Sequence, residues 1–201
     1  GSLLQPASIV DNRMVFDLNL VSFHATFTNN YVRLKVKDLR KNYDENADFQ
    51  DTYLSIKDDN TRNKYVYLNL DVLGPSFSFN IGRKNAVAFT TRFRTTVNFD
   101  NVTPELARLA WEGLDYPQLW QLDLKNERLS AQYMSWAEYG VTYGREIFQI
   151  NRHYLKGAVT VKLLQGMGAA YLFVDDLSYN FTNDDTLNLF NSDVKYGHST
   201  N

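Results

Sequence analysis

This sequence predicts an all-β fold, a long antiparallel meander, from three observations. Aromatic residues are frequent, with 13 Tyr, 13 Phe and 3 Trp in 201 residues, and such residues favour strands. Apolar and polar residues alternate with a period of two over stretches longer than the roughly 5–6 residues of a typical strand. Short turns alternate with long polar connections, which is typical of outer-membrane β-barrels. We therefore expect residues 1–201 to form a single domain of the β-barrel type.

The clearest alternation covers residues 85–99. One face of this segment is apolar, with Val87, Phe89, Phe93 and Val97. The opposite face is polar or small, with Ala86, Ala88, Thr90, Arg92 and Arg94. A strand with one apolar and one polar face is the interpretation that fits this pattern.

Other runs have the same alternation and a similar length. They cover residues 14–27, 65–82, 136–148, 155–165 and 169–181, with a weaker run at 187–196. Within 65–82 the phase changes at Gly74-Pro75, as it does at a β-bulge. Bacterial single-chain barrels have an even number of strands, about eight or more, so six or seven runs do not close one. We therefore expect the N-terminal part of a longer barrel, a fragment, or a strand set that closes with another chain.

The connections between the runs differ in length. Residues 82–85 and 149–153 predict tight turns, whereas residues 37–64 and 100–135 predict long polar loops. In the second loop, Thr103 followed by Pro104 predicts the start of a short helix, because Thr suits the N-cap and Pro the first helical position. A helix there would cap a pore or dock a partner.

The alternation separates two sets of candidate site residues. The polar faces carry the lumen-facing charged candidates, which are Asp71, Arg92, Arg94, Glu138, Glu146, Lys156 and Lys162. The apolar faces carry the lipid-facing candidates, which are Val87, Phe89, Phe93, Val97, Tyr139, Val141, Tyr143, Val159 and Val161. The charged set could select a solute or form an interior ion-pair network. The near balance of positive and negative residues favours the network.

No motif in the sequence indicates catalysis, a metal or a cofactor. The absence of Cys excludes disulfides, thiolate zinc sites and cysteine nucleophiles. His24, His153 and His198 lack the H-E-x-x-H spacing of a zinc protease. Gly166-Met167-Gly168 lacks the third Gly of a dinucleotide loop and predicts a turn between strands. We therefore expect no enzyme activity, no metal and no cofactor.

Acidic pairs are the remaining candidates for cation binding. They are Asp58-Asp59, Asp175-Asp176 and Asp184-Asp185. None has the spacing of an EF-hand loop, and solvated turn residues are the preferred interpretation.

Several short segments, in this order, carry a family resemblance. They include Phe16-Asp17-Leu18-Asn19-Leu20, Leu73-Gly74-Pro75-Ser76-Phe77, Thr91-Arg92-Phe93-Arg94 and Ser135-Trp136-Ala137-Glu138-Tyr139-Gly140. Together they resemble the N-terminal portion of an uncharacterised outer-membrane β-barrel family of Bacteroidota, a domain-of-unknown-function family. The resemblance implies a Gram-negative outer-membrane protein, usually longer than this chain, with no established activity and no catalytic residues. A looser likeness, in architecture only, is to long-chain fatty-acid-transporter barrels.

The predicted function is that of a non-enzymatic outer-membrane β-barrel protein with a transport, pore or envelope-assembly role. The expected location is the cell outer membrane, although this sequence shows no signal peptide. The expected partners are the lipid bilayer and other envelope proteins. A net charge of −2 gives no reason to expect a nucleic-acid partner. The alternative is a soluble cell-surface all-β binding or interaction module, in which the same strands pack as a sandwich.

Overall fold

A computed structural model of the chain describes residues 6–11, 15–36, 52–57, 61–113, 117–150, 153–183 and 186–200. Antiparallel strands dominate these residues. A short helix, α3 (Pro104–Glu112), follows Thr103 with Pro at its first turn. The predicted all-β class, the antiparallel meander and the short helix in a connecting loop are confirmed.

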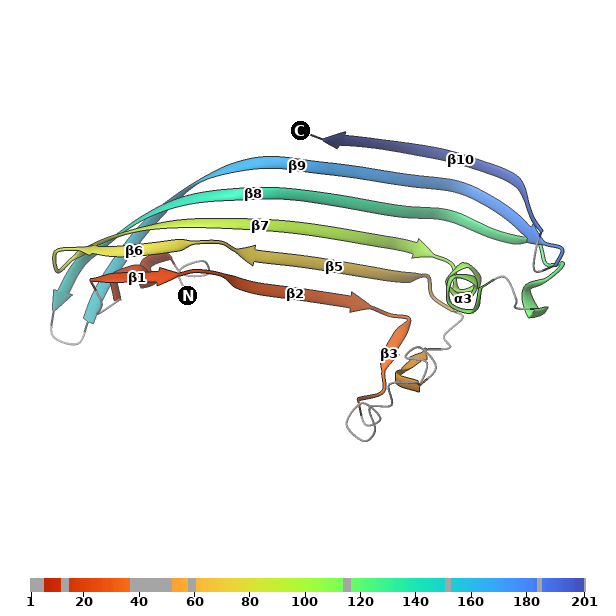
Figure 1. Cartoon of the computed structure of the whole chain (residues 1–201), viewed down its shortest axis with the longest axis horizontal. Coiled ribbons are helices and arrows are strands. Elements are labelled where there is room, and N and C mark those ends of the chain that lie inside the picture. The colour runs from red at the N-terminus through yellow and green to blue at the C-terminus, as the bar shows by residue number, and fades with distance from the viewer. Residues whose placement is uncertain are drawn as a thin grey trace.

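The main sheet is a single curved layer whose strands lie side by side nearly in chain order (Figure 1). β1 (Phe16–Asn19) and β2 (Ser22–Asn29) form the first row, and they pair with β6 (Ser76–Ile81) and β5 (Lys64–Leu73), which form the second. The remaining rows, in order, are β7 (Asn85–Val102), β8 (Leu124–Ile150), β9 (His153–Phe181) and β10 (Leu187–Thr200). A separate two-stranded sheet pairs β3 (Val32–Leu34) with β4 (Leu54–Ile56).

The main sheet is open. β1–β2 form one edge and β10 forms the other, and in the described part of the chain no strand pairs with the outer side of either edge. A closed barrel is therefore not what these residues form by themselves. The six rows are fewer than the roughly eight strands of the smallest bacterial barrels.

The predicted change of phase at Gly74-Pro75 marks the junction between β5 and β6. Val72 lies opposite Phe93, and Phe77 lies opposite Phe89, so both sides of the junction keep their apolar residues on one face. The Gly74 N–H donates to the Thr91 carbonyl at 2.8 Å. A Cβ at residue 74 would lie 2.5 Å from Thr91 Oγ1, so this close approach requires glycine.

The loop predicted over residues 100–135 is shorter than expected, which corrects its boundaries. β7 continues to Val102 and β8 begins at Leu124, so the connection covers residues 103–123. Four consecutive polar residues at 125–128 conceal the alternation there. In the structure Lys125 and Arg128 form ion pairs with Asp176 and Asp175 of β9, so polar side chains on this strand find cross-strand partners. In the loop predicted over 37–64, residues 37–51 and 58–60 lie outside the described residues, and 54–56 form β4.

The turn predicted at Gly166-Met167-Gly168 is also wrong, because residues 155–165 and 169–181 belong to one strand, β9. The register shifts here, since Trp136 lies opposite Gly166 while the preceding Ser135 lies opposite Gly168. One extra residue is therefore absorbed as a β-bulge. The pairing of β8 with β9 continues through the bulge, and the two strands are 27 and 29 residues long.

The two ends of the sheet differ. The turn end holds the β6–β7 turn and the tip of the β8–β9 hairpin, and the loop end holds α3 and the β3–β4 pair (Figure 1). At the turn end a 3-10 helix, η1 (Pro6–Asp11), lies against β7, β8 and β9. We call the face of the sheet that η1 covers the inner face, and the opposite face the outer face.

Candidate functional site

The strand register assigns every alternate residue to one face. Thr90, Gly140 and Lys162 lie opposite one another and form an inner row. The adjacent row of Phe89, Val141 and Val161 lies on the outer face. The predicted lumen-facing and lipid-facing residues therefore separate onto the two faces of one sheet.

All of the predicted lumen-facing charged residues lie on the inner face. Asp71, Arg92, Arg94, Glu138 and Lys162 gather in its middle. Glu146 and Lys156 lie opposite each other near the turn end, on the part of the β8–β9 hairpin that extends beyond β7. The register therefore brings together five of the seven candidates and sets the other two apart.

The first ion pair joins neighbouring rows. Arg92 of β7 donates through Nε and Nη2 to the two carboxylate oxygens of Asp71 on β5. Both side chains are mostly buried. A forked guanidinium–carboxylate pair of this kind fixes both side chains as well as neutralising them. His24 of β2 lies directly opposite Asp71 in the register.

Glu138 is the centre of the second group. Its carboxylate accepts from Lys162 Nζ at 3.0 Å, from Trp136 Nε1 at 3.0 Å and from Arg94 Nη1 at 3.5 Å. The Arg94 guanidinium also lies over the Trp136 ring, 5.2 Å from its centroid. Although its side chain is only 7% exposed, Glu138 therefore has three donors, as a buried carboxylate requires.

These contacts determine what the group can do chemically. Each of the five charged side chains already has an opposite charge within ion-pair distance. Ion pairs of this kind are what the network interpretation of the sequence predicts. An incoming charged solute would have to displace one of these partners, so the cluster is arranged to hold four neighbouring strands, β5, β7, β8 and β9, together across the inner face.

Sequence reasoning missed the cover at the turn end. Ile9 of η1 packs on Ala86 and Ala88, and all three are buried. A Cβ on Gly144 would lie 2.8 Å from a methyl group of Val10, so the absence of a side chain makes room for η1. The available signal was the small size of Ala86, Ala88 and Gly144 on the face expected to be polar.

A second packed cluster lies at the loop end. Tyr179, Phe181 and Asn126 are buried on β9 and β8, and Trp120 forms a bridge with Phe181. The Tyr179 hydroxyl lies near the Thr103 hydroxyl, but it makes no hydrogen bond of normal geometry within the described residues.

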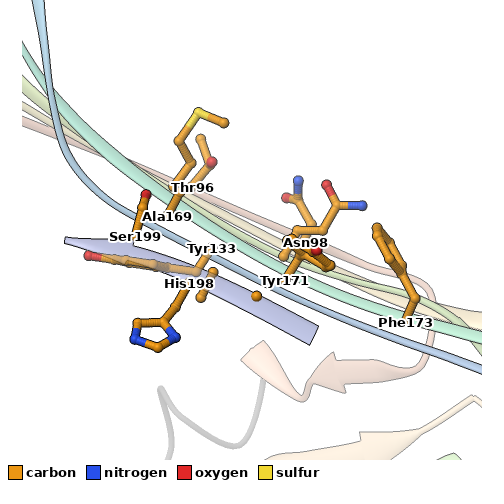
Figure 2. Close-up of a pocket in the computed structure, with 12 residues that line it drawn as sticks. Thr96, Asn98, Tyr133, Ala169, Tyr171, Phe173, His198 and Ser199 are labelled. Atoms are coloured by element: carbon orange, nitrogen blue, oxygen red, sulfur yellow. The ribbon is translucent and has the colours of Figure 1, made fainter. Parts of the chain in front are cut away.

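A groove lies between these features, beside the free edge of β10 (Figure 2). We call it the β10 groove, and its volume is about 590 Å³. Most of its lining comes from inner-face positions, chiefly Asn98, Gln132, Met134, Tyr171, Phe173 and Ser199. In Figure 2, Phe173 and Ser199 point to one side of the sheet and His198 points to the other.

The predicted lipid-facing residues share the outer face. Val141, Val159 and Val161 are 52%, 68% and 71% exposed. Phe93, Tyr139 and Tyr143 are also exposed, whereas Val87, Phe89 and Val97 are half-buried among their neighbours. Within the described residues, no second sheet covers this face, as a sandwich would require. Contact with lipid remains a prediction.

The other candidates from the sequence are scattered. His24 and His198 lie on opposite edge strands, and the side chain of His153 lies outside the described residues, as do Asp58-Asp59 and Asp184-Asp185. Asp175 and Asp176 belong to β9 rather than to a turn, and both form ion pairs with lysines. Among the described residues no group of three His, Asp or Glu side chains is placed to hold a metal ion.

In the part of the chain that the structure describes, no helix has both the length and the apolar character needed to cross a membrane. Comparison with curated proteins and with solved structures gives no match. Comparison with protein families does: residues 6–200 match a family described as "Family of unknown function (DUF5723)", and the chain belongs to that family.

Proposed function

We propose that this chain is the membrane-embedded part of an outer-membrane β-barrel with a transport, pore or envelope-assembly role. The observation that carries the proposal is the exposure of the outer apolar rows, which include Val141, Val159, Val161 and Leu163. A continuous apolar surface of this kind is unfavourable in water. It is what a barrel strand presents to hydrocarbon.

The inner face supports the same proposal from the other side. Its charges are paired, with Arg92 on Asp71 and with Arg94 and Lys162 on Glu138. The interior of a membrane barrel accepts polar groups of this kind, whereas its lipid-facing surface does not. The inner face holds paired polar groups and the outer face holds apolar rows, which is the reverse of a water-soluble protein. This arrangement is expected where lipid is the surrounding solvent.

The dimensions also fit. About 9–11 residues of a tilted strand cross the hydrocarbon layer, and β7 to β10 are 14 to 29 residues long. The strands are therefore long enough to cross and to extend beyond the membrane on one or both sides.

In a membrane, the two open edges of the sheet would need further strands to pair with. In hydrocarbon every backbone N–H and C=O needs a partner. The outer sides of β1–β2 and of β10 must therefore pair with further strands, and their own exposed apolar residues, such as Phe23 and Tyr196, must continue the outer face. Neither edge strand contains a proline, and β1 and β2 contain no lysine. The one lysine of β10, Lys195, forms ion pairs with Asp175 and Asp193.

Detergent dependence tests the proposal directly. The purified chain should remain monodisperse in a mild non-ionic detergent and should aggregate when the detergent is removed, as measured by size-exclusion chromatography with light scattering. It should also float with lipid vesicles in a density gradient after refolding. A chain that stays monodisperse and folded without detergent would instead favour the soluble cell-surface module.

A further inference from the structure

We propose that the β10 groove binds a neutral, mostly apolar small molecule that carries a few hydroxyl or amide groups. The groove lies on the inner face beside β10, between the ion pairs of Glu138 and the loop end. Its volume of about 590 Å³ is that of a small-molecule site. The inference depends on the proposed function only in that a closed barrel would shelter this face from lipid.

The walls of the groove are aromatic and apolar. Tyr171 and Phe173 alternate on β9 with their ring centroids 5.3 Å apart, and Met134 lies on the neighbouring strand. The two rings are tilted by 31° to each other, and they offer apolar faces against which a ligand can pack. A thioether side chain such as that of Met134 adapts to ligands of different shape.

Apart from His198, which points to the other side of the sheet, the polar side chains of the groove are of uncharged types. They include the side-chain amides of Asn98 and Gln132 and the hydroxyls of Thr96 and Ser199. Such groups both donate and accept hydrogen bonds, so they orient a ligand through its own hydroxyl, amide or amine groups. The lining contains no Asp, Glu, Lys or Arg.

The charged side chains nearest the groove have partners. Asp100, in the same row as Phe173, accepts from the Asn101 N–H and lies against the Tyr67 hydroxyl. Towards the turn end, Arg94 is held by Glu138. Towards the loop end, Lys195 lies opposite Phe173 in the register and contacts both Asp175 and Asp193. A charged ligand would lose its hydration without gaining a free counter-charge, so the site favours a neutral one.

The absence of a side chain at Gly197 leaves space for the ring of Tyr171. A Cβ at residue 197 would lie 2.7 Å from Tyr171 Cε1, so the Tyr171 ring occupies the space above the β10 backbone that a side chain would fill. Tyr171 is therefore placed across the last two strands, where it forms part of the groove.

Two fluorescent probes of nearly the same skeleton test the inference. N-phenyl-1-naphthylamine is neutral, and 8-anilino-1-naphthalenesulfonate adds a sulfonate. The full chain is held in amphipol, and the signal of empty amphipol is subtracted. We expect the neutral probe to bind at least about tenfold more tightly than the sulfonate, since an unpaired charge costs more than 1.4 kcal/mol.

Variants locate the binding. Tyr171→Ser should weaken binding of the neutral probe about five- to tenfold, the loss expected for an aromatic contact. Tyr139→Ser is the matched control, because Tyr139 is similarly exposed but lies on the outer face. It should change binding by less than about twofold. Gly197→Val keeps Tyr171 but displaces its ring, so it should also weaken binding even if Tyr171→Ser folds poorly.

Equal binding of both probes, an equal loss in the Tyr139 variant, or unchanged binding in both groove variants would overturn the inference. Its failure can be told apart from that of the proposed function. If the chain needs no detergent and yet binds the neutral probe through Tyr171, the groove stands while the membrane proposal falls. If the chain inserts into vesicles and the Tyr171 variant binds like wild type, the reverse holds.

Discussion

The two faces of the sheet are built from the same strands, yet they treat polar and apolar groups in opposite ways. On the inner face the carboxylate of Glu138 is almost fully enclosed and accepts from three donors. On the outer face Val161, from the strand next to it, is 71% exposed. Soluble proteins enclose valine and expose glutamate far more often than the reverse. The inner face therefore satisfies its polar groups with partners within the chain, whereas the apolar side chains of the outer face are exposed. Lipid is the neighbour that we propose for them.

The largest expected effect comes from placing a charge on the outer face. Phe93→Arg should impair insertion into lipid vesicles by about 2–4 kcal/mol, the cost of Arg near mid-depth on a lipid-facing barrel position. Urea titration of refolding into liposomes, followed by Trp fluorescence, measures it. Thr90→Arg, on the inner face of the same strand, should change stability by less than about 1 kcal/mol, because Gly140 beside it leaves room. Equal behaviour of the two variants would remove the distinction between the faces.

The next effect concerns the carboxylate at the centre of the inner face. Glu138→Gln keeps the shape but leaves Arg94 and Lys162 without their counter-charge. Since both cations are partly exposed, solvent offsets part of the loss, and we expect destabilisation of about 1–2 kcal/mol. The comparison is Asp193→Asn, which removes an exposed partner of Lys195 and should destabilise the protein less than Glu138→Gln does. A loss no larger for Glu138 than for Asp193 would contradict the network.

The cover at the turn end predicts a local rather than a global effect. Gly144→Val places methyl groups where Ile9 and Val10 of η1 pack, and overpacking of this kind costs about 1–3 kcal/mol. We expect faster hydrogen exchange and easier proteolysis of residues 6–11, with the sheet retained. Gly166→Val is the control, because a Cβ there meets nothing within 4 Å. If hydrogen exchange and proteolysis of residues 6–11 were unchanged in the Gly144 variant, the position of η1 would not depend on its contact with Gly144.

The smallest effect compares two tyrosine hydroxyls. Tyr179→Phe removes a buried hydroxyl that makes no hydrogen bond in the described residues, so stability should be unchanged or rise by up to about 1 kcal/mol. Tyr143→Phe removes an exposed hydroxyl that donates to Asn85 Oδ1 at 2.8 Å, and it should cost up to about 0.5 kcal/mol. Thermal or urea unfolding of the two variants in the same detergent checks the opposite signs.

The strands could be predicted where a period of two was strong, as over residues 85–99, because an alternation fixes both the extended conformation and the face of each residue. Prediction failed where local composition conflicted with pairing. The polar run at 125–128 suggested a loop, and the glycines at 166 and 168 suggested a turn. In both places the pairing of β8 with β9 outweighs local preference, since each residue is held by a cross-strand partner.

The site was predicted in part. The sequence identified the charged residues of the inner face but not which ones would meet, because that depends on the register between β5, β7, β8 and β9. The 3-10 helix η1 and the β10 groove were both missed. Each is formed by segments far apart in the chain. Small residues such as Ala86 and Gly197 leave space beside the backbone, but the sequence does not show which side chain fills that space.

The amino-acid pattern alone predicts long antiparallel strands, each with one apolar and one polar face. Side-chain direction alternates along any extended backbone, so this information is local. Three features appear only once the strands are assembled: the sheet is open, Glu138 contacts Arg94, Lys162 and Trp136, and η1 covers the turn end. These features depend on strand register and curvature, which are set by contacts across the whole sheet rather than by any one segment.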